Sequence, residues 1–132
     1  MQSRVCTELD RRQAAAWMSR RIGMEFPDSW FIRNTGIAVF DADRLYAVII
    51  LYIDRAGNIG QIGWTMTHPE NSPRESYRAL SIGIPETVKL ARNCGVRYLM
   101  SYIAVPGVNR LLKKSGFADG DAGGVQKCKI LY

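Results

Sequence analysis

Four side chains in the middle and last third of the chain could move protons. His68 and Glu70 lie between an apolar run and a helix start, and either could take a proton, because imidazole titrates near neutrality and a carboxylate is a general base. Ser101 and Tyr102 are neighbours in a β-rich segment and carry hydroxyl groups that could donate one. The structural alternatives are a solvated or capping role for His68 and strand alternation between core and surface for Ser101 and Tyr102.

The composition is that of an ordinary globular protein. The 132 residues, 47% hydrophobic and 23% charged, suffice for one domain with its own core. No apolar run reaches the ~18 residues that span a bilayer, and residues 1–4 indicate no secretory signal. Cys6, Cys94 and Cys128 lack metal-ligand spacing, so we expect reduced thiols, a cytoplasmic protein and no metal site.

The net charge of +6, from 18 Lys and Arg against 12 Asp and Glu, favours a polyanionic partner. Such a partner is a phosphate-bearing small molecule, a nucleic acid or an acidic protein. The cations are scattered rather than blocked, so a soluble surface with a mild excess of Arg is the alternative.

The first half of the chain predicts one helix and a three-stranded meander. Thr7 is a suitable N-cap and Gly23 a suitable stop for the helix. β-branched and aromatic residues predict strands at 37–40, 44–53 and 59–67. A further strand near residues 4–6 and a helical turn within 24–35 are also compatible with the sequence.

The second half predicts a long helix followed by strand, helix and strand. Ser72-Pro73-Arg74-Glu75 is a helix start, and the pattern ends at Gly95. Pro85 interrupts this pattern, so either the helix kinks or the long helix starts near Pro85. We then expect a strand at 96–105, a helix at 107–115 and a strand at 125–132. This order predicts an α/β (α+β) mixed sheet with helices on both faces.

The order of elements over about residues 36–132 resembles the GNAT acetyltransferase superfamily. The resemblance rests on the meander, the helix ending at Gly95, the strand Tyr98–Val105 and a last helix closing in Lys-Ser-Gly-Phe at 114–117. It implies one GNAT-like domain, 1–132, with a mainly antiparallel mixed sheet and a gap between two strands that receives acyl-CoA. The implied activity is acetyl transfer from acetyl-CoA to an amine by direct attack in a ternary complex.

The superfamily's phosphate motif is Gln or Arg, two residues, Gly, one residue, and Gly or Ala, at the start of the long helix. Its best match is Arg78-Ala79-Leu80-Ser81-Ile82-Gly83. If the long helix begins just after this stretch, its small residues let backbone N–H groups cradle the CoA pyrophosphate, and Arg78 adds charge. If the helix begins at Pro73, the same residues are ordinary helix and there is no phosphate loop. The sequence leaves both open.

The catalytic residues implied by the resemblance depart from the usual pattern. Many members carry a Tyr four residues before the Gly of the Gly-Phe, as the acid for the departing thiolate, and Leu112 stands there. Tyr102 or Ser101 could replace it, and His68 lies where the donor's acyl group would sit, with Glu70 as the other candidate base. The implied cofactor contacts are Met66, Thr67, Arg78, Ser81, Gly83 and Asn109, the last bonding the pantetheine.

Three functions therefore stand at this point. The first is an acyl-CoA-dependent N-acyltransferase acting on a small-molecule or protein amine. The second is a phage-type GNAT-like protein that modifies or binds DNA, as Mom-type modifiers do. The third is a catalytically inactive structural protein of the same fold, favoured by Leu112 and Ser81. Superfamily members often form homodimers.

Overall fold

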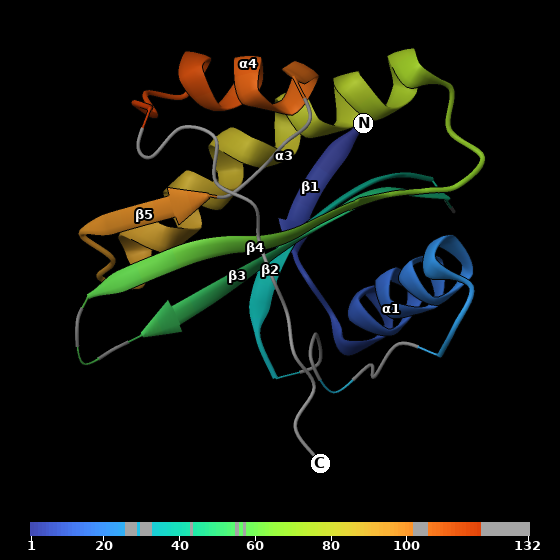
Figure 1. Cartoon of the computed structure of the whole chain (residues 1–132), viewed down its shortest axis with the longest axis horizontal. Coiled ribbons are helices and arrows are strands. Elements are labelled where there is room, and N and C mark those ends of the chain that lie inside the picture. The colour runs from blue at the N-terminus through green and yellow to red at the C-terminus, as the bar shows by residue number, and fades with distance from the viewer. Residues whose placement is uncertain are drawn as a thin grey trace.

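The central element of the computed structural model is a five-stranded sheet in the order β1-β2-β3-β4-β5 (Figure 1). The strands are Gln2–Val5 (β1), Thr35–Asp41 (β2), Arg44–Asp54 (β3), Ile59–Thr67 (β4) and Tyr98–Ser101 (β5). Neighbouring strands are antiparallel except β4 and β5, which are parallel. The structure describes residues 1–25, 29, 33–42, 44–54, 56, 58–101 and 106–119.

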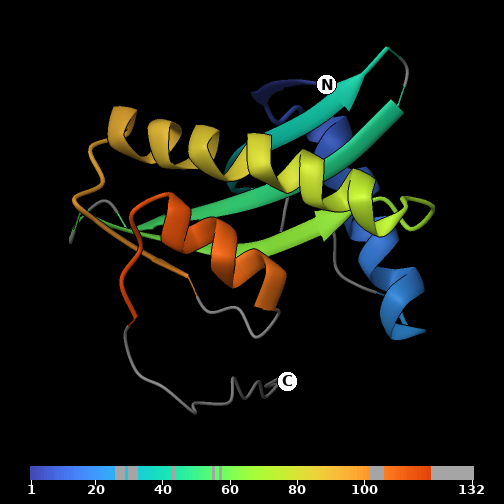
Figure 2. The ribbon, with the colours of Figure 1, turned by 90° about the horizontal axis from the view of Figure 1, so that it is seen from above.

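Helices cover both faces of the sheet. Glu8–Ile22 (α1) packs on one face, and Pro73–Asn93 (α3) and Pro106–Lys114 (α4) lie side by side on the other (Figures 1 and 2). The parallel pair β4 and β5 is joined by α3, the crossover that parallel strands require. The predicted mixed α/β fold with a mainly antiparallel sheet is confirmed. Within the described part of the chain, no helix is long and apolar enough to cross a membrane.

The N-terminal strand is held to α1 by a charged contact. Arg4 donates to the Asp10 carboxylate at 2.8 and 3.2 Å, and Asp10 is only 4% exposed. Thr7 Oγ1 accepts the Asp10 N–H at 3.1 Å, which makes Thr7 the N-cap, and Gly23 closes the helix at φ 70°. Both predicted ends of α1 are confirmed, and β1 confirms the strand expected near residues 4–6.

The long helix α3 begins at Pro73 and runs without interruption past Pro85. Pro85 is exposed, and the cost of its missing N–H, about 3 kcal/mol in a helix interior, is offset by the burial of the opposite face of the helix. Gly83 lies on that buried face, where a Cβ would stand 2.7 Å from Ile49 Cδ1 and 3.1 Å from Val39 Cγ2. The capping sequence at Ser72 therefore defines the start of the helix, and Gly83 lets α3 approach the sheet closely.

Two apolar clusters fill the space on either side of the sheet. Trp17, Met18, Ile50 and Met66 belong to the cluster under α1. The cluster under α3 and α4 is larger and includes both Leu111 and Leu112. The predicted strands 37–40, 44–53 and 59–67 and the helix 107–115 correspond to β2, β3, β4 and α4. Residues 102–105 of the predicted fourth strand, the strand 125–132 and most of the turn within 24–35 lie outside the described residues.

Candidate functional site

Among the described residues, the pairing between β4 and β5 extends over the first four residues of β4. The paired residues run from Ile59 opposite Tyr98 to Ile62 opposite Ser101. β4 itself continues to Thr67. On the β5 side of Gly63–Thr67, no described residue forms a strand pair. Backbone N–H and C=O groups that lack a strand partner can pair with an extended ligand, so this edge is a candidate binding site.

A β-bulge at Gly63 interrupts the pairing of β4 with its other neighbour, β3. Trp64 lies opposite Ile50 and Ile62 lies opposite Leu51, so Gly63 is an extra residue without a partner on β3. The bulge reverses the facing of the strand: Ile62 packs under α3, whereas Trp64 and Met66 pack on the α1 side. Bulges redirect side chains and interrupt regular pairing beside functional sites.

Tyr52 covers the bulge from the α1 side of the sheet. A Cβ at Gly63 would collide with the Tyr52 ring, so only glycine fits beneath it. Burial raises the pKa of Tyr52 above its ordinary 10.0, partly opposed by a hydrogen bond from the Trp64 side chain. The phenol is thus protonated at neutral pH. Tyr52 does not stand out in the sequence because it lies in a long apolar run, although a glycine within a strand, such as Gly63, is itself a signal of close approach.

Ser101 lies at the last β4–β5 pair and carries an unused polar atom. Its Oγ is buried and has no hydrogen-bond partner among the residues that the structure describes. Strand alternation places it on the face of Leu99, toward α3. An unpartnered buried hydroxyl has a cost, and Ser101 belongs to the last described β4–β5 pair. Ser101 thus remains a candidate proton donor, whereas Tyr102 lies outside the described residues.

His68 has a structural role in the loop that follows β4. Its Nδ1 accepts the Glu70 N–H at 3.0 Å, and its ring meets the Trp17 ring edge-on, with centroids 5.2 Å apart. A nitrogen that accepts a backbone N–H carries no proton, so the proton of neutral His68 is on Nε2. The nitrogen that could take a proton therefore already accepts a hydrogen bond from the Glu70 N–H. His68 and Glu70 as general bases stay predictions, and in this geometry a base role for His68 would require that hydrogen bond to break.

Asn71 ties this loop to β3. Its amide nitrogen donates to the Tyr46 carbonyl at 3.0 Å, and its amide oxygen accepts from Arg44 at 2.8 Å. His68 N–H also donates to the Tyr46 carbonyl, at 2.9 Å. These contacts hold the loop in one closed arrangement above the end of β4.

The start of α3 is capped by two side chains at that end of the helix, Ser72 and Glu75. Ser72 Oγ accepts the Glu75 N–H at 3.1 Å, and Glu75 Oε2 accepts the Ser72 N–H at 2.7 Å. The hydrogen bond from the Ser72 N–H holds the pKa of Glu75 below its ordinary 4.5. The charge of Arg44, whose Nη2 lies 3.9 Å from Glu75 Oε2, acts in the same direction. A helix N-terminus attracts anions. Here the anion already in place is the Glu75 carboxylate.

Of the two alternatives that the sequence leaves open for Arg78, Ser81 and Gly83, the structure has the helix that begins at Pro73 and not the phosphate loop. All three residues lie inside α3, where helical hydrogen bonding uses the backbone N–H groups. Ser81 Oγ donates to the Arg78 carbonyl at 2.7 Å, and Gly83 faces the sheet. The capping box at Ser72 provides a defined helix start, so no loop forms around Gly83.

The remaining predicted contacts are divided between core and surface. The Met66 side chain is 1% exposed and packs under α1, which leaves only its backbone for a ligand, and Thr67 is half-buried at the strand end. Asn109 is exposed on the first turn of α4. Leu112 is 4% exposed in the core, so no proton donor comes from its position. Among the described residues, no three His, Cys, Asp or Glu side chains form a metal-binding group.

The sequence matches no protein-family model and no curated protein. Solved structures match along almost the whole chain. A probable acetyltransferase is 13% identical with a TM-score of 0.71, and the match covers 100% of this chain and 99% of that one. The ribosomal-protein-alanine N-acetyltransferase of Brucella melitensis biovar Abortus 2308 is 13% identical, with a TM-score of 0.63 and coverage of 96% and 100%. A predicted acetyltransferase from Clostridium acetobutylicum, solved with acetyl-CoA, is 15% identical, with a TM-score of 0.62 and coverage of 96% and 95%.

These similarities establish the fold. The chain has the GNAT-type fold of acetyltransferases, with β4 and β5 as the parallel pair and α3 as the crossover.

Proposed function

We propose that the protein is an acyl-CoA-dependent N-acyltransferase that transfers an acetyl group directly to an amine. The observation that carries this proposal is the bulge at Gly63 of β4, which directly follows Ile62, the last β4 residue with a described partner on β5. We infer that the β4 edge from Gly63 to Thr67, which no described residue pairs on the β5 side, receives an extended ligand. The fold supports the proposal because similar solved structures are acetyltransferases, one of them with acetyl-CoA.

The donor is a substrate that supplies an activated acetyl thioester. The backbone of Gly63–Thr67 would bind it by main-chain hydrogen bonds, as an edge strand binds an extended chain. Ser101 Oγ, buried and without a described partner, belongs to the last described β4–β5 pair and would lie beside the donor. These groups fit the thioester end of the donor.

The phosphate end of the donor fits less well. The start of α3 is occupied by the Ser72–Glu75 capping box, so the donor's pyrophosphate would have to displace the Glu75 carboxylate. Arg44 lies beside that carboxylate and would remain to pair with the incoming anion. We therefore expect the affinity for acetyl-CoA to be limited by the charge of Glu75.

Two different groups, Ser101 and water, would take part in the proton transfers. As the amine nitrogen bonds to the acetyl carbon and the carbon–sulfur bond breaks, Ser101 Oγ would donate a proton to the leaving sulfur and regain one from the water that takes the amine proton. The amine proton would pass to water, because the Nδ1 of His68 is already bonded. Tyr52 and Trp64, on the opposite face from Ser101, would line the acceptor side.

Release of the CoA thiol tests this proposal. Acetyl-CoA is incubated with the protein and a panel of amines (a polyamine, a lysine-containing peptide, a peptide with a free N-terminus and duplex DNA). Faster thiol release with one acceptor, lost in Ser101→Ala, is the expected result. The absence of both acetyl-CoA binding and thiol release would favour an inactive protein of the same fold.

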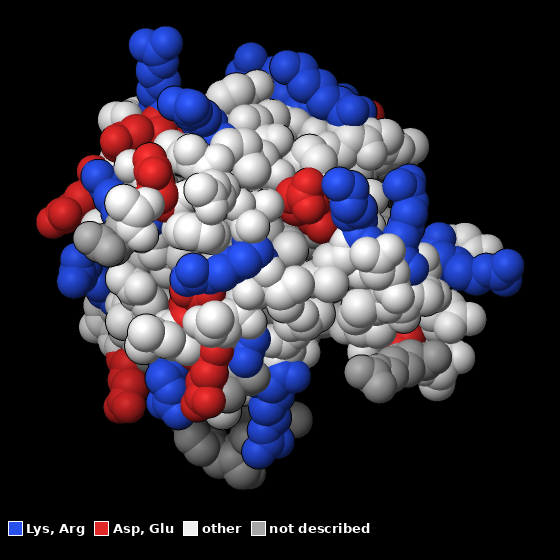
Figure 3. Space-filling model, turned by 180° about the vertical axis from the view of Figure 1, so that it is seen from behind, with Lys and Arg blue, Asp and Glu red and all other residues white. Residues whose placement is uncertain are grey.

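A second function, binding or modification of nucleic acid, is favoured by the charge of one face. The helices α3 and α4 carry seven cationic and two acidic side chains, and the rim where they lie shows mainly Lys and Arg in Figure 3. Lys89 and Lys113 are paired with acids. The cations with no ion pair to a described residue are Arg74, Arg78, Arg92, Arg110 and Lys114.

Gel-shift titration with duplex DNA tests this second function. Binding through five unpaired cations would weaken steeply between low and physiological salt, because phosphate contacts release counterions. Arg74→Gln combined with Arg110→Gln should reduce the salt dependence, and Arg20→Gln on α1 is the control. Absence of any shift at low salt would remove nucleic acid as a partner.

A further inference from the structure

The side chain of Tyr52 spans the gap between two strands. Tyr52 belongs to β3, but its ring atoms Cε2, Cδ2 and Cζ are the nearest atoms that a Cβ at Gly63 of β4 would meet, with Cζ at 3.2 Å. The hydroxyl group is bonded to Cζ, so it also lies beside Gly63. Gly63 directly follows the last β4 residue that has a described partner on β5.

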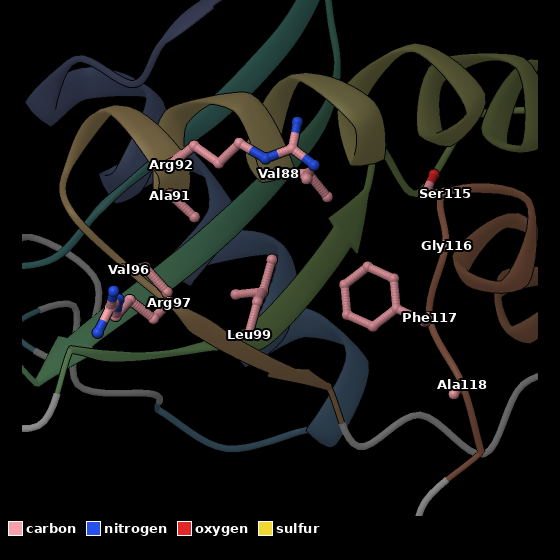
Figure 4. A pocket seen from close by; sticks show the side chains of 10 residues that line it. All are labelled: Val88, Ala91, Arg92, Val96, Arg97, Leu99, Ser115, Gly116, Phe117 and Ala118. Atoms are coloured by element: carbon pink, nitrogen blue, oxygen red, sulfur yellow. The ribbon is translucent and has the colours of Figure 1, made fainter.

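Tyr52 and Ser101 lie on opposite faces of the sheet. Tyr52 packs against the apolar cluster under α1. On β5, the Leu99 side chain points toward α3, into a pocket of about 350 Å³ that Val88 also lines (Figure 4), and strand alternation places Ser101 on the same side. The two hydroxyl groups therefore approach the edge Gly63–Thr67 from the two faces of the sheet.

The Tyr52 hydroxyl is suited to donate a hydrogen bond. Burial raises the pKa of this phenol above its ordinary 10.0, so the phenol keeps its proton at neutral pH. An indole can only donate, so in the hydrogen bond between Trp64 and Tyr52 the phenol oxygen accepts and the O–H proton is not used. A hydroxyl that already accepts a bond is a stronger donor, because hydrogen bonds in a chain polarise one another.

We propose that the Tyr52 hydroxyl donates a hydrogen bond to the carbonyl oxygen of the bound acetyl thioester and stabilises the negative charge that forms there. This inference rests on the proposed function. The sulfur and the carbonyl oxygen of a thioester are bonded to the same carbon and point apart. A thioester that lies across the β4 edge with its sulfur beside Ser101 therefore presents its oxygen to the face of Tyr52.

This hydrogen bond would strengthen as the reaction proceeds. When the amine nitrogen bonds to the acetyl carbon, an electron pair of the carbonyl double bond moves onto the oxygen. The pair returns to the double bond when the carbon–sulfur bond breaks and the sulfur takes the Ser101 proton. Tyr52 keeps its own proton throughout. A donor directed at charge that exists only during the reaction raises kcat more than affinity.

Infrared difference spectroscopy tests this contact without an acceptor amine, using acetyl-CoA labelled with ¹³C at the acetyl carbonyl. A hydrogen bond lowers the stretching frequency of a carbonyl, so the band of the bound donor should lie lower with wild type than with Tyr52→Phe. Tyr52→Phe keeps the ring over Gly63 and therefore the packing of the bulge. Tyr98→Phe removes an exposed hydroxyl at the other end of β5 and should give the wild-type band.

Thiol release gives a second readout for the same variants. Tyr52→Phe should lower kcat about 10²-fold with every amine that wild type accepts, with little change in the KM for the amine. A Tyr52 that only lines the acceptor side would raise the KM for the amine and leave kcat unchanged. Tyr98→Phe should match wild type in both constants.

The outcomes separate this inference from the proposed function. If acetyl-CoA binds and thiol is released, but Tyr52→Phe has the wild-type carbonyl band or the wild-type kcat, the role of Tyr52 is wrong and the proposed function stands. A change confined to the KM for the amine has the same meaning. If wild type does not bind acetyl-CoA, both are wrong.

Discussion

The ring of Tyr52 lies directly over Gly63, the extra residue of the β4 bulge, at a distance that leaves no room for a Cβ. This contact joins the two features that define the candidate site. The bulge turns Trp64 toward the α1 side, and the last described pair of β4 with β5 lies one residue before Gly63. A change at Gly63 should therefore affect both the fold and the open edge of β4.

Gly63→Ala should destabilise the protein by about 1–3 kcal/mol, because the added methyl must displace the Tyr52 ring or the strand. Thiol release from acetyl-CoA should fall with it. Urea unfolding measures the first effect. Gly107→Ala is the control, since a Cβ there meets no atom within 4 Å. An unchanged unfolding midpoint for Gly63→Ala would contradict the close contact.

Ser101→Ala should leave stability unchanged or slightly higher, because the Ser101 hydroxyl is buried without a partner and its removal relieves a desolvation cost. If Ser101 donates the proton to the leaving sulfur, the same variant should lower kcat by about 10²-fold with little change in the KM for acetyl-CoA. Ser81→Ala, whose hydroxyl bonds within α3, is the control. A Ser101→Ala variant with unchanged kcat would remove Ser101 from the reaction.

Glu75→Gln should raise the affinity for acetyl-CoA about twofold to fivefold at low salt, because it removes a negative charge from the helix end that would face the donor's phosphates. Gln can keep the capping-box bond to the Ser72 N–H, so α3 should keep its cap. Glu86→Gln, farther along α3 and paired with Lys89, is the control. Calorimetric titration with acetyl-CoA measures the affinity of both variants and of wild type. Equal affinities of Glu75→Gln and wild type would show that the phosphates do not approach Glu75.

Asp10→Asn should lower stability by about 1–2 kcal/mol at neutral pH, because Asp10 accepts bonds from Arg4 and from the Thr7 N–H. Burial raises the pKa of Asp10, but these hydrogen bonds outweigh it and the net pKa lies below the ordinary 3.8. The carboxylate therefore stabilises the fold above pH 3.8, and this contribution is lost as the pH falls through the lower folded value.

Urea midpoints between pH 6 and about pH 2.5 check this prediction for wild type and Asp10→Asn. The variant should lose less stability on acidification than wild type. Glu8→Gln, which breaks the exposed pair with Arg12, should change stability by no more than about 0.5 kcal/mol. Identical pH profiles for wild type and Asp10→Asn would contradict the assignment.

The elements could be predicted from local signals, because caps and alternation act over a few residues. Ser72 with Glu75 defined the start of α3 once Pro85 was free to face solvent, and Thr7 with Gly23 bounded α1. Whether Gly83 lies in a loop or inside α3 could not be decided from neighbouring residues. It depended on Ile49 and Val39, which lie far away in the sequence and become neighbours only when the sheet forms.

The site could be predicted only in part. Ser101 was identified as a hydroxyl-bearing strand residue, but its missing partner is a property of the packed structure. The bulge depends on the pairing register of two strands, and it cannot be read from β4 alone. His68 has the right chemistry for a base, but its Nδ1 accepts the backbone N–H of Glu70, a contact that depends on the fold of the loop.

The central claim is that the open edge of β4 receives the acyl donor, and an acetyl-CoA titration of the ¹⁵N-labelled protein tests it most directly. We predict saturable shifts at the amides of Gly63–Thr67 and at Ser101 below roughly 1 mM ligand, the upper range of typical substrate affinities. Shifts confined to the cationic side of α3 and α4, or no shifts at that concentration, would contradict the assignment of this edge as the donor site.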